Sequence, residues 1–165
     1  MHRKIWLRDR ILENKWTHGA ELGLWDGRTY LYLLNECPDL NLIGVDCWQD
    51  NGIYTGTDKD GNVWNHAQHE IKVRQGARQF GPRATLYKAF TTAAARFVEN
   101  ASLDFIFIDA DHSEQAVKQD IFFWKPKLKR TGMLSGHDID WPGVQSALEK
   151  LEIKYSTGPD NVWHA

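Results

Sequence analysis

The stretch LDFIFID, residues 103–109, is the clearest structural element in the sequence. Its four consecutive apolar residues, 105–108, come directly before Asp109. An apolar run of this length, without alternating polar residues, is typical of a strand that helices cover on both faces. We therefore predict a strand of a parallel sheet here, with Asp109 at its carboxyl end.

Strand and helix patterns alternate on both sides of this segment. Further strands are predicted over 18–24, 41–46, 84–88 and 133–137, with two short strands over 152–156 and 161–165. Apolar spacing and capping residues predict helices over 4–16, 27–36, 64–80, 91–100 and 113–124, and one that begins at Pro142. The last two strands are joined by too few residues for a parallel crossover. We therefore predict a doubly wound, Rossmann-like α/β fold with a mostly parallel seven-stranded sheet and an antiparallel last strand.

Length and composition limit the classes of function. A chain of 165 residues suits one domain, and 1–17 are interpreted as a lead-in helix. The net charge of −2 gives no reason to expect nucleic acid or an acidic membrane as a partner. There is no membrane-spanning run, no secretory pattern and no disulfide framework, so we predict a cytoplasmic protein.

Acidic residues lie within or directly after four of the predicted strands. These residues are Glu21, Asp46, Asp109, Asp111 and Asp138. In open α/β sheets, ligands bind beyond the carboxyl ends of the strands. Because like charges at one sheet edge are costly unless relieved, we expect these acids to surround a positively charged ligand.

The loop after the first strand has the spacing G-x-x-x-G, at Gly23 and Gly27. Dinucleotide-binding folds prefer G-x-G-x-x-G, but here Trp25 stands at the second glycine position. Asp26 would also repel a phosphate at the helix N-terminus. The loop therefore argues against an NAD-dependent oxidoreductase. Asp46 can still accept hydrogen bonds from both hydroxyls of a ribose, so S-adenosylmethionine fits as a cationic nucleoside without phosphate.

Four segments together resemble the class I S-adenosylmethionine-dependent methyltransferases. They are ELGLWDGRTYLYLL (21–34), LIGVDCW (42–48), LDFIFIDADHSEQAVKQDI (103–121) and GMLSGHDIDWPGVQSALE (132–149). The closer likeness is to the small bacterial and phage group with F-I-D-G-D-H-S and G-H-D-Y signatures. The resemblance covers about 18–163 and implies that 1–165 form a single methyltransferase domain. It also implies the following donor contacts: Glu21, Gly23, Asp46, the backbone near Lys88 and Ala89, and Asp111.

A second resemblance concerns a metal. The segments FIFIDADH and GHDI are similar to those of the cation-dependent O-methyltransferases of the catechol and caffeoyl type. In that family an Asp after strand four and an Asp-Asn pair after strand five hold a divalent ion, and Asp109 and Asp138 match the two aspartates. Ile139 replaces the asparagine, so either His137 substitutes as a ligand or the site holds no metal. Carboxylates suit Mg²⁺, and an imidazole ligand would also admit Zn, Fe or Ni.

The predicted function is methyl transfer from S-adenosylmethionine to a small-molecule acceptor, at oxygen. His112 or His137 is the candidate base, and Asp109 and Asp138 would orient this base or hold the metal. The loop over 48–63 is expected to select the acceptor. The alternative is a binding module that holds S-adenosylmethionine or a similar nucleoside without turnover. The lead-in helix and the eight Trp are compatible with a homodimer.

Several aromatic and histidine residues have simpler interpretations. His66 and His69 have a spacing that could bind metal, but an exposed polar helix face is the preferred interpretation. Trp48 and Trp141 follow predicted site residues and are candidate walls of the acceptor pocket.

Overall fold

The computed structural model describes residues 1–49 and 65–165. Most of the predicted acceptor loop, 48–63, therefore lies outside the described residues. Within the described part, no helix combines the length and the apolar character needed to cross a bilayer.

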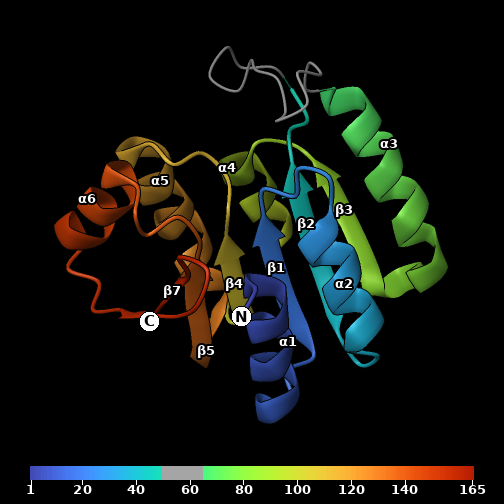
Figure 1. Ribbon diagram of the computed structural model, residues 1–165, viewed down its shortest axis with the longest axis horizontal. Helices are drawn as coiled ribbons and strands as arrows, with labels where there is room; N and C mark the ends of the chain where they lie inside the picture. Colours follow the sequence, from blue (N-terminus) through green and yellow to red (C-terminus); the bar gives the residue numbers. More distant parts are fainter. Residues whose placement is uncertain (50–64) are drawn as a thin grey trace.

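The centre of the molecule is one seven-stranded sheet with the order β3-β2-β1-β4-β5-β7-β6 (Figure 1). Its strands are β1 (His18–Leu22), β2 (Asn41–Asp46), β3 (Ala84–Lys88), β4 (Leu103–Ile108), β5 (Leu128–Gly136), β6 (Ser156–Thr157) and β7 (Trp163–His164). The first five strands pair in parallel, and β7 is antiparallel to both β5 and β6. This topology confirms the predicted fold class.

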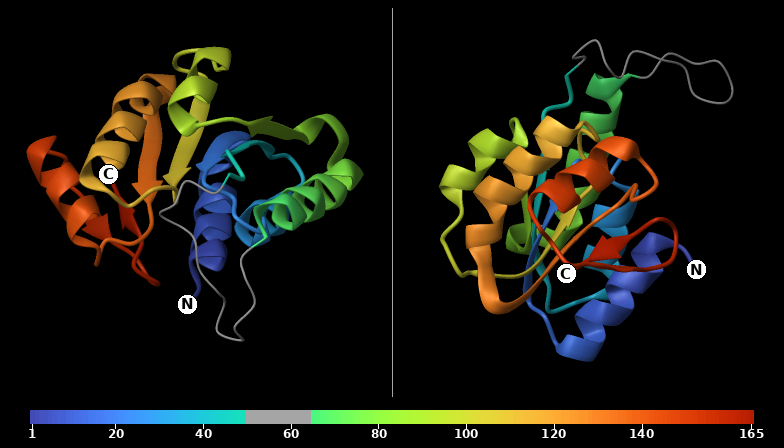
Figure 2. Two further views of the ribbon diagram at one scale, coloured as in Figure 1. Left: turned by 90° about the horizontal axis from the view of Figure 1, so that it is seen from above. Right: turned by 90° about the vertical axis from the view of Figure 1, so that its left-hand side faces the viewer.

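Helices cover both faces of the sheet (Figures 1 and 2). The first face carries α1 (Arg3–Asn14), α2 (Arg28–Glu36) and α3 (His66–Ala77). The second face carries α4 (Thr91–Ala94), α5 (Glu114–Trp124) and α6 (Pro142–Lys150). Short 3-10 turns follow three of these helices: η1 (Arg78–Arg83), η2 (Ala95–Phe97) and η3 (Lys125–Lys127).

Strand β4 shows why the apolar run at its centre predicted a doubly covered strand. Successive side chains of a strand point to opposite faces. Phe105 and Phe107 pack with α1 and α2 on one side, whereas Ile106 and Ile108 pack with α5 and α6 on the other. All four side chains are buried, so both faces of the strand require apolar residues.

Helix-start signals had mixed outcomes. Ser113 caps α5 as predicted, since its hydroxyl accepts a hydrogen bond from the Ala116 N–H at 3.3 Å. Pro142 opens α6 in the first turn, as predicted. The predicted helix over 91–100 is wrong in length, because α4 ends at Ala94. Thr91 also makes no capping bond; its hydroxyl donates instead to the carboxylate of Asp120.

Strand β5 is longer than predicted. The expected start at 133 is wrong because the strand runs from Leu128 through Thr131 and Gly132. A Cβ on Gly132 would lie 3.0 Å from the carbonyl oxygens of Leu103 and Asp104. The β4–β5 register shifts at this point, so the glycine permits close backbone approach within the strand. The two end strands, β6 and β7, are shorter than predicted, with two residues each.

Candidate active site

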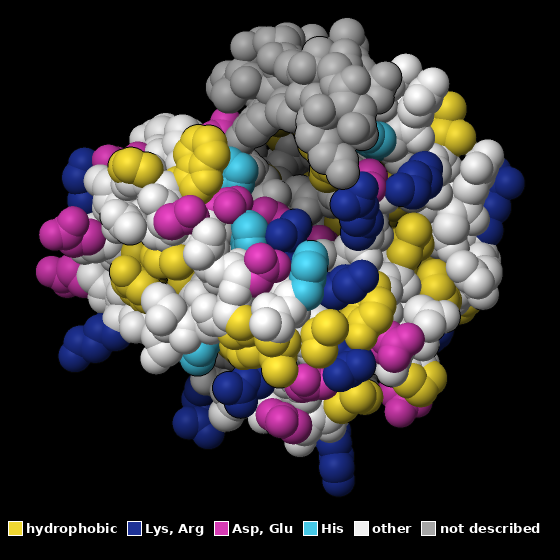
Figure 3. Space-filling model, in the orientation of Figure 1, with side chains coloured by type: hydrophobic (Ala, Val, Ile, Leu, Met, Phe, Trp, Pro, Cys, Tyr) yellow, Lys and Arg dark blue, Asp and Glu magenta, His cyan; other side chains and the backbone are white. Residues whose placement is uncertain are grey.

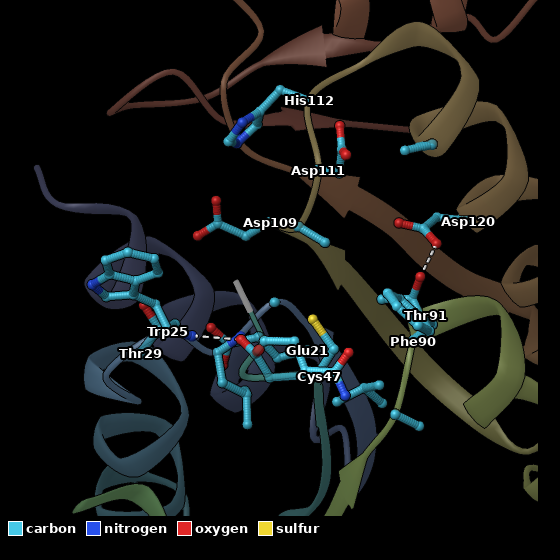
Figure 4. Close-up of a pocket in the computed structure, with 18 of the residues that line it drawn as sticks. Glu21, Trp25, Thr29, Cys47, Phe90, Thr91, Asp109, Asp111, His112 and Asp120 are labelled. Carbon is cyan, nitrogen blue, oxygen red and sulfur yellow. Dashed lines mark hydrogen bonds between the residues drawn. The ribbon is translucent and has the colours of Figure 1, made fainter. Parts of the chain in front are cut away.

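A cavity of about 710 Å³ lies beyond the carboxyl ends of β1, β2 and β4. This is the topological switch point of the sheet, because β2 and β3 are added on one side of β1 and β4 and β5 on the other. The cavity lining includes four of the five acids expected to lie together, namely Glu21, Asp46, Asp109 and Asp111, whereas Asp138 is outside the lining. In Figure 4, Trp25 lies at one end of this cavity and Asp120 at the other, with Glu21 between them.

The loop after β1 is fixed against the loop after β4. Gly23 has a φ of +87°, and its N–H donates to the Val45 carbonyl oxygen at 2.8 Å. A Cβ at this position would lie 2.1 Å from the backbone oxygen of Asp109. Only glycine fits this close approach, which brings the end of β1 directly against Asp109.

Asp46 holds the same loop from the other side. Its Oδ2 accepts hydrogen bonds from the backbone N–H groups of Leu24 and Trp25 at 2.8 and 2.9 Å. Its Oδ1 accepts one from the Trp48 N–H at 2.7 Å. A carboxylate has about four acceptor positions, so three are already used. Asp46 therefore keeps about one position for a ribose, rather than both oxygens as the sequence suggested.

Glu21 is the most deeply buried acid of the cavity. Glu21 is 2 % exposed, and its Oε2 has no hydrogen-bond partner among the described residues. Burial raises the pKa of this carboxyl well above its ordinary value, and the charges of Asp109 and Asp46 raise it further. A buried acid without a partner is costly, and a cation placed in the cavity would relieve that cost.

Asp26 differs from its predicted role. Its Oδ2 lies 2.7 Å from Nε of Arg28 and 3.2 Å from Nζ of Lys72. Burial would raise the pKa of Asp26, but these two cations outweigh burial and lower it. Because its charge is compensated, Asp26 does not repel a phosphate as strongly as the sequence suggested. The case against a dinucleotide then depends on Trp25, whose φ is +52° at the position of the missing glycine.

A second cluster lies beside the cavity, around Asp138. Its Oδ2 lies 2.5 Å from Nε2 of His112, and its Oδ1 lies 2.9 Å from Nδ1 of His137. Burial would lower the pKa of both histidines, but the bonds to Asp138 outweigh burial and raise it. Burial would likewise raise the pKa of Asp138, yet the two imidazoles hold it well below its ordinary value. The three side chains form one ion-paired unit.

Asp109 connects this unit to the main cavity. Its Oδ1 lies 3.6 Å from Nδ1 of His137. Burial raises the pKa of Asp109 to about 6, although Arg3 and His137 lower it. Asp109 therefore lines the main cavity and also faces His137.

The residues predicted to bind a metal do come together. Ligand atoms of Asp109, His137 and Asp138 all lie within 4.8 Å of one another. Two carboxylates and an imidazole suit a divalent ion in their chemistry. However, the guanidinium of Arg3 already contacts two of the three, since Nη2 lies 3.2 Å from Oδ2 of Asp109 and Nη1 lies 3.2 Å from Nε2 of His137.

Other predicted site residues separate into two groups. Ala89, Asp111 and His112 line the main cavity. Lys88 does not, because its Nζ pairs with a carboxylate oxygen of Glu70 at 2.5 Å. His137 lines only a neighbouring void of about 10 Å³.

The predictions for the aromatic and histidine residues had mixed outcomes. Trp48 is buried and outside the cavity lining, where its Nε1 donates to the Trp25 carbonyl oxygen at 3.0 Å. Trp141 is 52 % exposed and stacks on His112 with ring centroids 4.9 Å apart. His66 and His69 are half-buried against Trp25 rather than exposed on a polar helix face.

The sequence analysis missed several lining residues, and three polar ones among them take part in ion pairs or hydrogen bonds. Arg3, Thr91 and Asp120 all line the cavity. Asp120 had a detectable signal, because it falls three residues after Val117 on the buried face of α5. Arg3 had none, since its partners are more than a hundred residues away: His137 is 134 positions further along the chain.

Residues 20–139 match the family model described as a methyltransferase domain. The chain belongs to this family. No match was found among curated proteins. The methyltransferase is similar in fold to several solved structures, at sequence identities that show the fold alone.

One of these structures, from Staphylococcus aureus, is named as a proposed caffeoyl-CoA O-methyltransferase. It has 15 % identity and a TM-score of 0.71, over 98 % of this chain and 80 % of the other. An SAH-bound methyltransferase from Podospora anserina has 14 % identity and a TM-score of 0.69, over 98 % and 76 %. An O-methyltransferase from Bacillus cereus in complex with SAH has 12 % identity and a TM-score of 0.67, over 98 % and 79 %.

Proposed function

We propose that this methyltransferase transfers the methyl group of S-adenosylmethionine to a hydroxyl oxygen of a small molecule. The observation that carries the proposal is Glu21, whose buried carboxylate has an unpartnered oxygen in the main cavity. The donor carries a sulfonium and an ammonium group, and either cation would compensate this acid. The names of two fold neighbours, which include bound SAH, agree with such a donor.

The remaining cavity residues suit the rest of the donor. Asp46 has an acceptor position left for a ribose hydroxyl. Ala89 and Thr91, which follow β3, offer a surface for the adenine beside the ribose. Asp111, after β4, lines the same space. We therefore retain Glu21, Gly23, Asp46, Ala89 and Asp111 as donor-binding residues, and the predicted backbone contact near Lys88 stays a prediction.

The chemical step requires alignment and removal of one proton. The acceptor oxygen forms a bond to the methyl carbon, the carbon–sulfur bond breaks, and its electron pair returns to sulfur as a neutral thioether. The acceptor proton passes to a base. His112 is favoured for this role because it lines the main cavity, whereas His137 does not.

Asp138 positions His112 for this task. Its Oδ2 lies 2.5 Å from Nε2 of His112, where the carboxylate orients the ring and stabilises its protonated form. Trp141 stacks on the ring and restricts its orientation.

A divalent ion, where bound, would be held by Asp109, His137 and Asp138. It would lower the pKa of the acceptor hydroxyl and help to orient it. The base and positioning roles of His112 and Asp138 do not depend on this ion. The choice between metal-assisted and metal-free transfer can be made by adding EDTA to an active preparation.

The principal experiment measures formation of S-adenosylhomocysteine with a panel of phenols, sugars and polyketide alcohols. The proposal expects turnover with at least one acceptor and a matching methylated product. Binding of S-adenosylmethionine without product from any acceptor would support the non-catalytic binding module instead. Fluorescence of bound NADH would instead support an NAD-dependent oxidoreductase.

Several features of the protein's setting stay predictions from the sequence. They are the single-domain organisation, the cytoplasmic location, the homodimer, and the lack of nucleic-acid and membrane partners. Size-exclusion chromatography with light scattering would test the homodimer.

A further inference from the structure

The start of α1 lies against the cluster formed by Asp109, His137 and Asp138. The backbone N–H of Arg3 donates to Oδ2 of Asp160 at 3.0 Å, and Nδ1 of His2 lies 3.5 Å from the same oxygen. Asp160 belongs to the turn between β6 and β7. These contacts fix the first residues of α1 where the side chain of Arg3 reaches the cavity. On the face drawn in Figure 3, histidine, acidic and basic side chains gather near the centre.

The guanidinium of Arg3 bridges two of the three candidate metal ligands. Nη2 lies 3.2 Å from Oδ2 of Asp109, and Nη1 lies 3.2 Å from Nε2 of His137. Arginine has five N–H donors and no acceptor. Nε2 of His137 is therefore the acceptor in this contact and carries no proton.

This contact determines the state of the other nitrogen. A neutral imidazole with an unprotonated Nε2 has its proton on Nδ1. Nδ1 of His137 lies 2.9 Å from Oδ1 of Asp138, so the proton on this nitrogen lies beside a carboxylate. One nitrogen is occupied by a guanidinium N–H and the other carries a proton, which leaves His137 without a lone pair for a metal.

We propose that Arg3 is the built-in cation of the cluster formed by Asp109, His137 and Asp138. The guanidinium and a divalent ion then exclude each other, because both need Asp109 and His137 and two cations this close would repel. Metal binding requires that Arg3 withdraw, which couples the position of the α1 start to metal occupancy. The inference deepens the proposed function, since it concerns the acceptor end of the same site.

Metal titrations of the full chain test this proposal. Mn²⁺ binding is followed by the loss of its free electron paramagnetic resonance signal, without donor or acceptor. The variants are Arg3→Ala and Arg10→Ala; Arg10 is on the same helix, but its side chain is 44 % exposed and pairs with Glu13 at 3.5 Å. We expect Arg3→Ala to bind Mn²⁺ at least roughly tenfold more tightly than the wild type. Arg10→Ala should match the wild type.

Two further variants keep the test decisive. Asp109→Asn, added to Arg3→Ala, should abolish the increase in Mn²⁺ affinity. This result would assign the ion to the cluster of Asp109, His137 and Asp138. Asp160→Asn leaves the guanidinium but removes the charge that anchors the α1 start, so it should give a smaller gain of the same kind. If Arg3→Ala fails to fold by circular dichroism, Asp160→Asn and Arg3→Gln carry the test.

The proposal is overturned if the wild type binds Mn²⁺ as tightly as the Arg3 variants. It is equally overturned if neither binds, or if Asp109→Asn leaves the gain intact. Because no donor or acceptor is present, these results do not depend on methyl transfer. Failure of the proposed function would appear separately, as absence of S-adenosylhomocysteine formation.

Discussion

Gly23 packs so closely against Asp109 that a Cβ on the glycine would lie 2.1 Å from the aspartate's backbone oxygen. This contact joins the loop after β1 to the end of β4. Two acids far apart in sequence, Glu21 and Asp109, thereby line one cavity. The site depends on this junction more than on any single hydrogen bond.

Gly23→Ala should therefore damage both stability and donor binding. The new methyl group would clash with the backbone of Asp109 and Ala110, which cannot rotate away as a side chain could. The φ of +87° is also unfavourable for alanine. We expect a loss of roughly 2–4 kcal/mol in the free energy of unfolding, measured with urea. Gly81→Ala is the control, because its φ is also positive but no atom lies within 4 Å of the added Cβ. It should lose stability through backbone strain alone and keep the wild-type affinity for S-adenosylmethionine.

Asp46→Ala should destabilise the fold as well as weaken binding. Three backbone N–H groups, of Leu24, Trp25 and Trp48, would lose their acceptor. At about 1 kcal/mol for each bond, the free energy of unfolding should fall by roughly 2–4 kcal/mol. Unchanged thermal unfolding would contradict this structural role.

Asp120 should make stability depend on pH. Burial raises its pKa in the folded state to about 7 from an ordinary 3.8, against the lowering effect of the Thr91 hydroxyl. An acid whose pKa is raised on folding stabilises the folded state while protonated, and that contribution is lost as pH rises from about 4 through about 7. Asp120→Asn removes the titration. The free energy of unfolding of Asp120→Asn minus that of the wild type, measured with urea, should increase by roughly 2–4 kcal/mol between about pH 5 and about pH 8.

Glu114 supplies the matched control for that measurement. Bonds from Lys150 and Ser146 lower its pKa to about 2, so its contribution is present above its ordinary pKa and lost only in strong acid. The difference between wild type and Glu114→Gln should stay constant between about pH 5 and about pH 8. A constant difference for Asp120→Asn as well would show that Asp120 is not an acid of raised pKa.

His112→Gln should reduce turnover without loss of the donor. His112 lines the main cavity and His137 does not, so removal of the base at 112 should lower kcat by roughly 10²–10⁴-fold. The affinity for S-adenosylmethionine, measured by calorimetry, should change little. His137→Gln is the comparison, with a smaller expected effect on kcat. The reverse order of effects would transfer the role of base to His137.

Local sequence patterns were sufficient for most of the fold. Strands β2 (Asn41–Asp46) and β3 (Ala84–Lys88) have the predicted bounds, because short apolar runs there end at polar or turn residues. The start of β5 was missed because its pairing with β4 includes a register shift around Gly132. Such a shift depends on the facing strand, so no pattern within β5 could reveal it.

The site divides in the same way. Glu21, Asp46 and Asp109 could be placed at one edge because parallel strands end together. The compensation of Asp26 by Lys72 depends on α3, which follows the loop outside the described residues. The contact of Arg3 with Asp109 depends on how α1 packs across the sheet. These long-range ion pairs changed the electrostatic account of the cavity, and neither has a local sequence signal.

The most direct test of the account is calorimetric titration of S-adenosylmethionine into the wild type and Glu21→Gln. The substitution keeps the size of the buried side chain but removes the acid that a cationic donor would compensate. We predict that the wild type binds and that the variant binds roughly 10–100-fold more weakly, with unfolding free energy equal or higher. Glu114→Gln, at a residue outside the cavity lining, should keep wild-type affinity. No binding by the wild type, or equal binding by Glu21→Gln, would contradict the claim that this cavity holds a positively charged nucleoside.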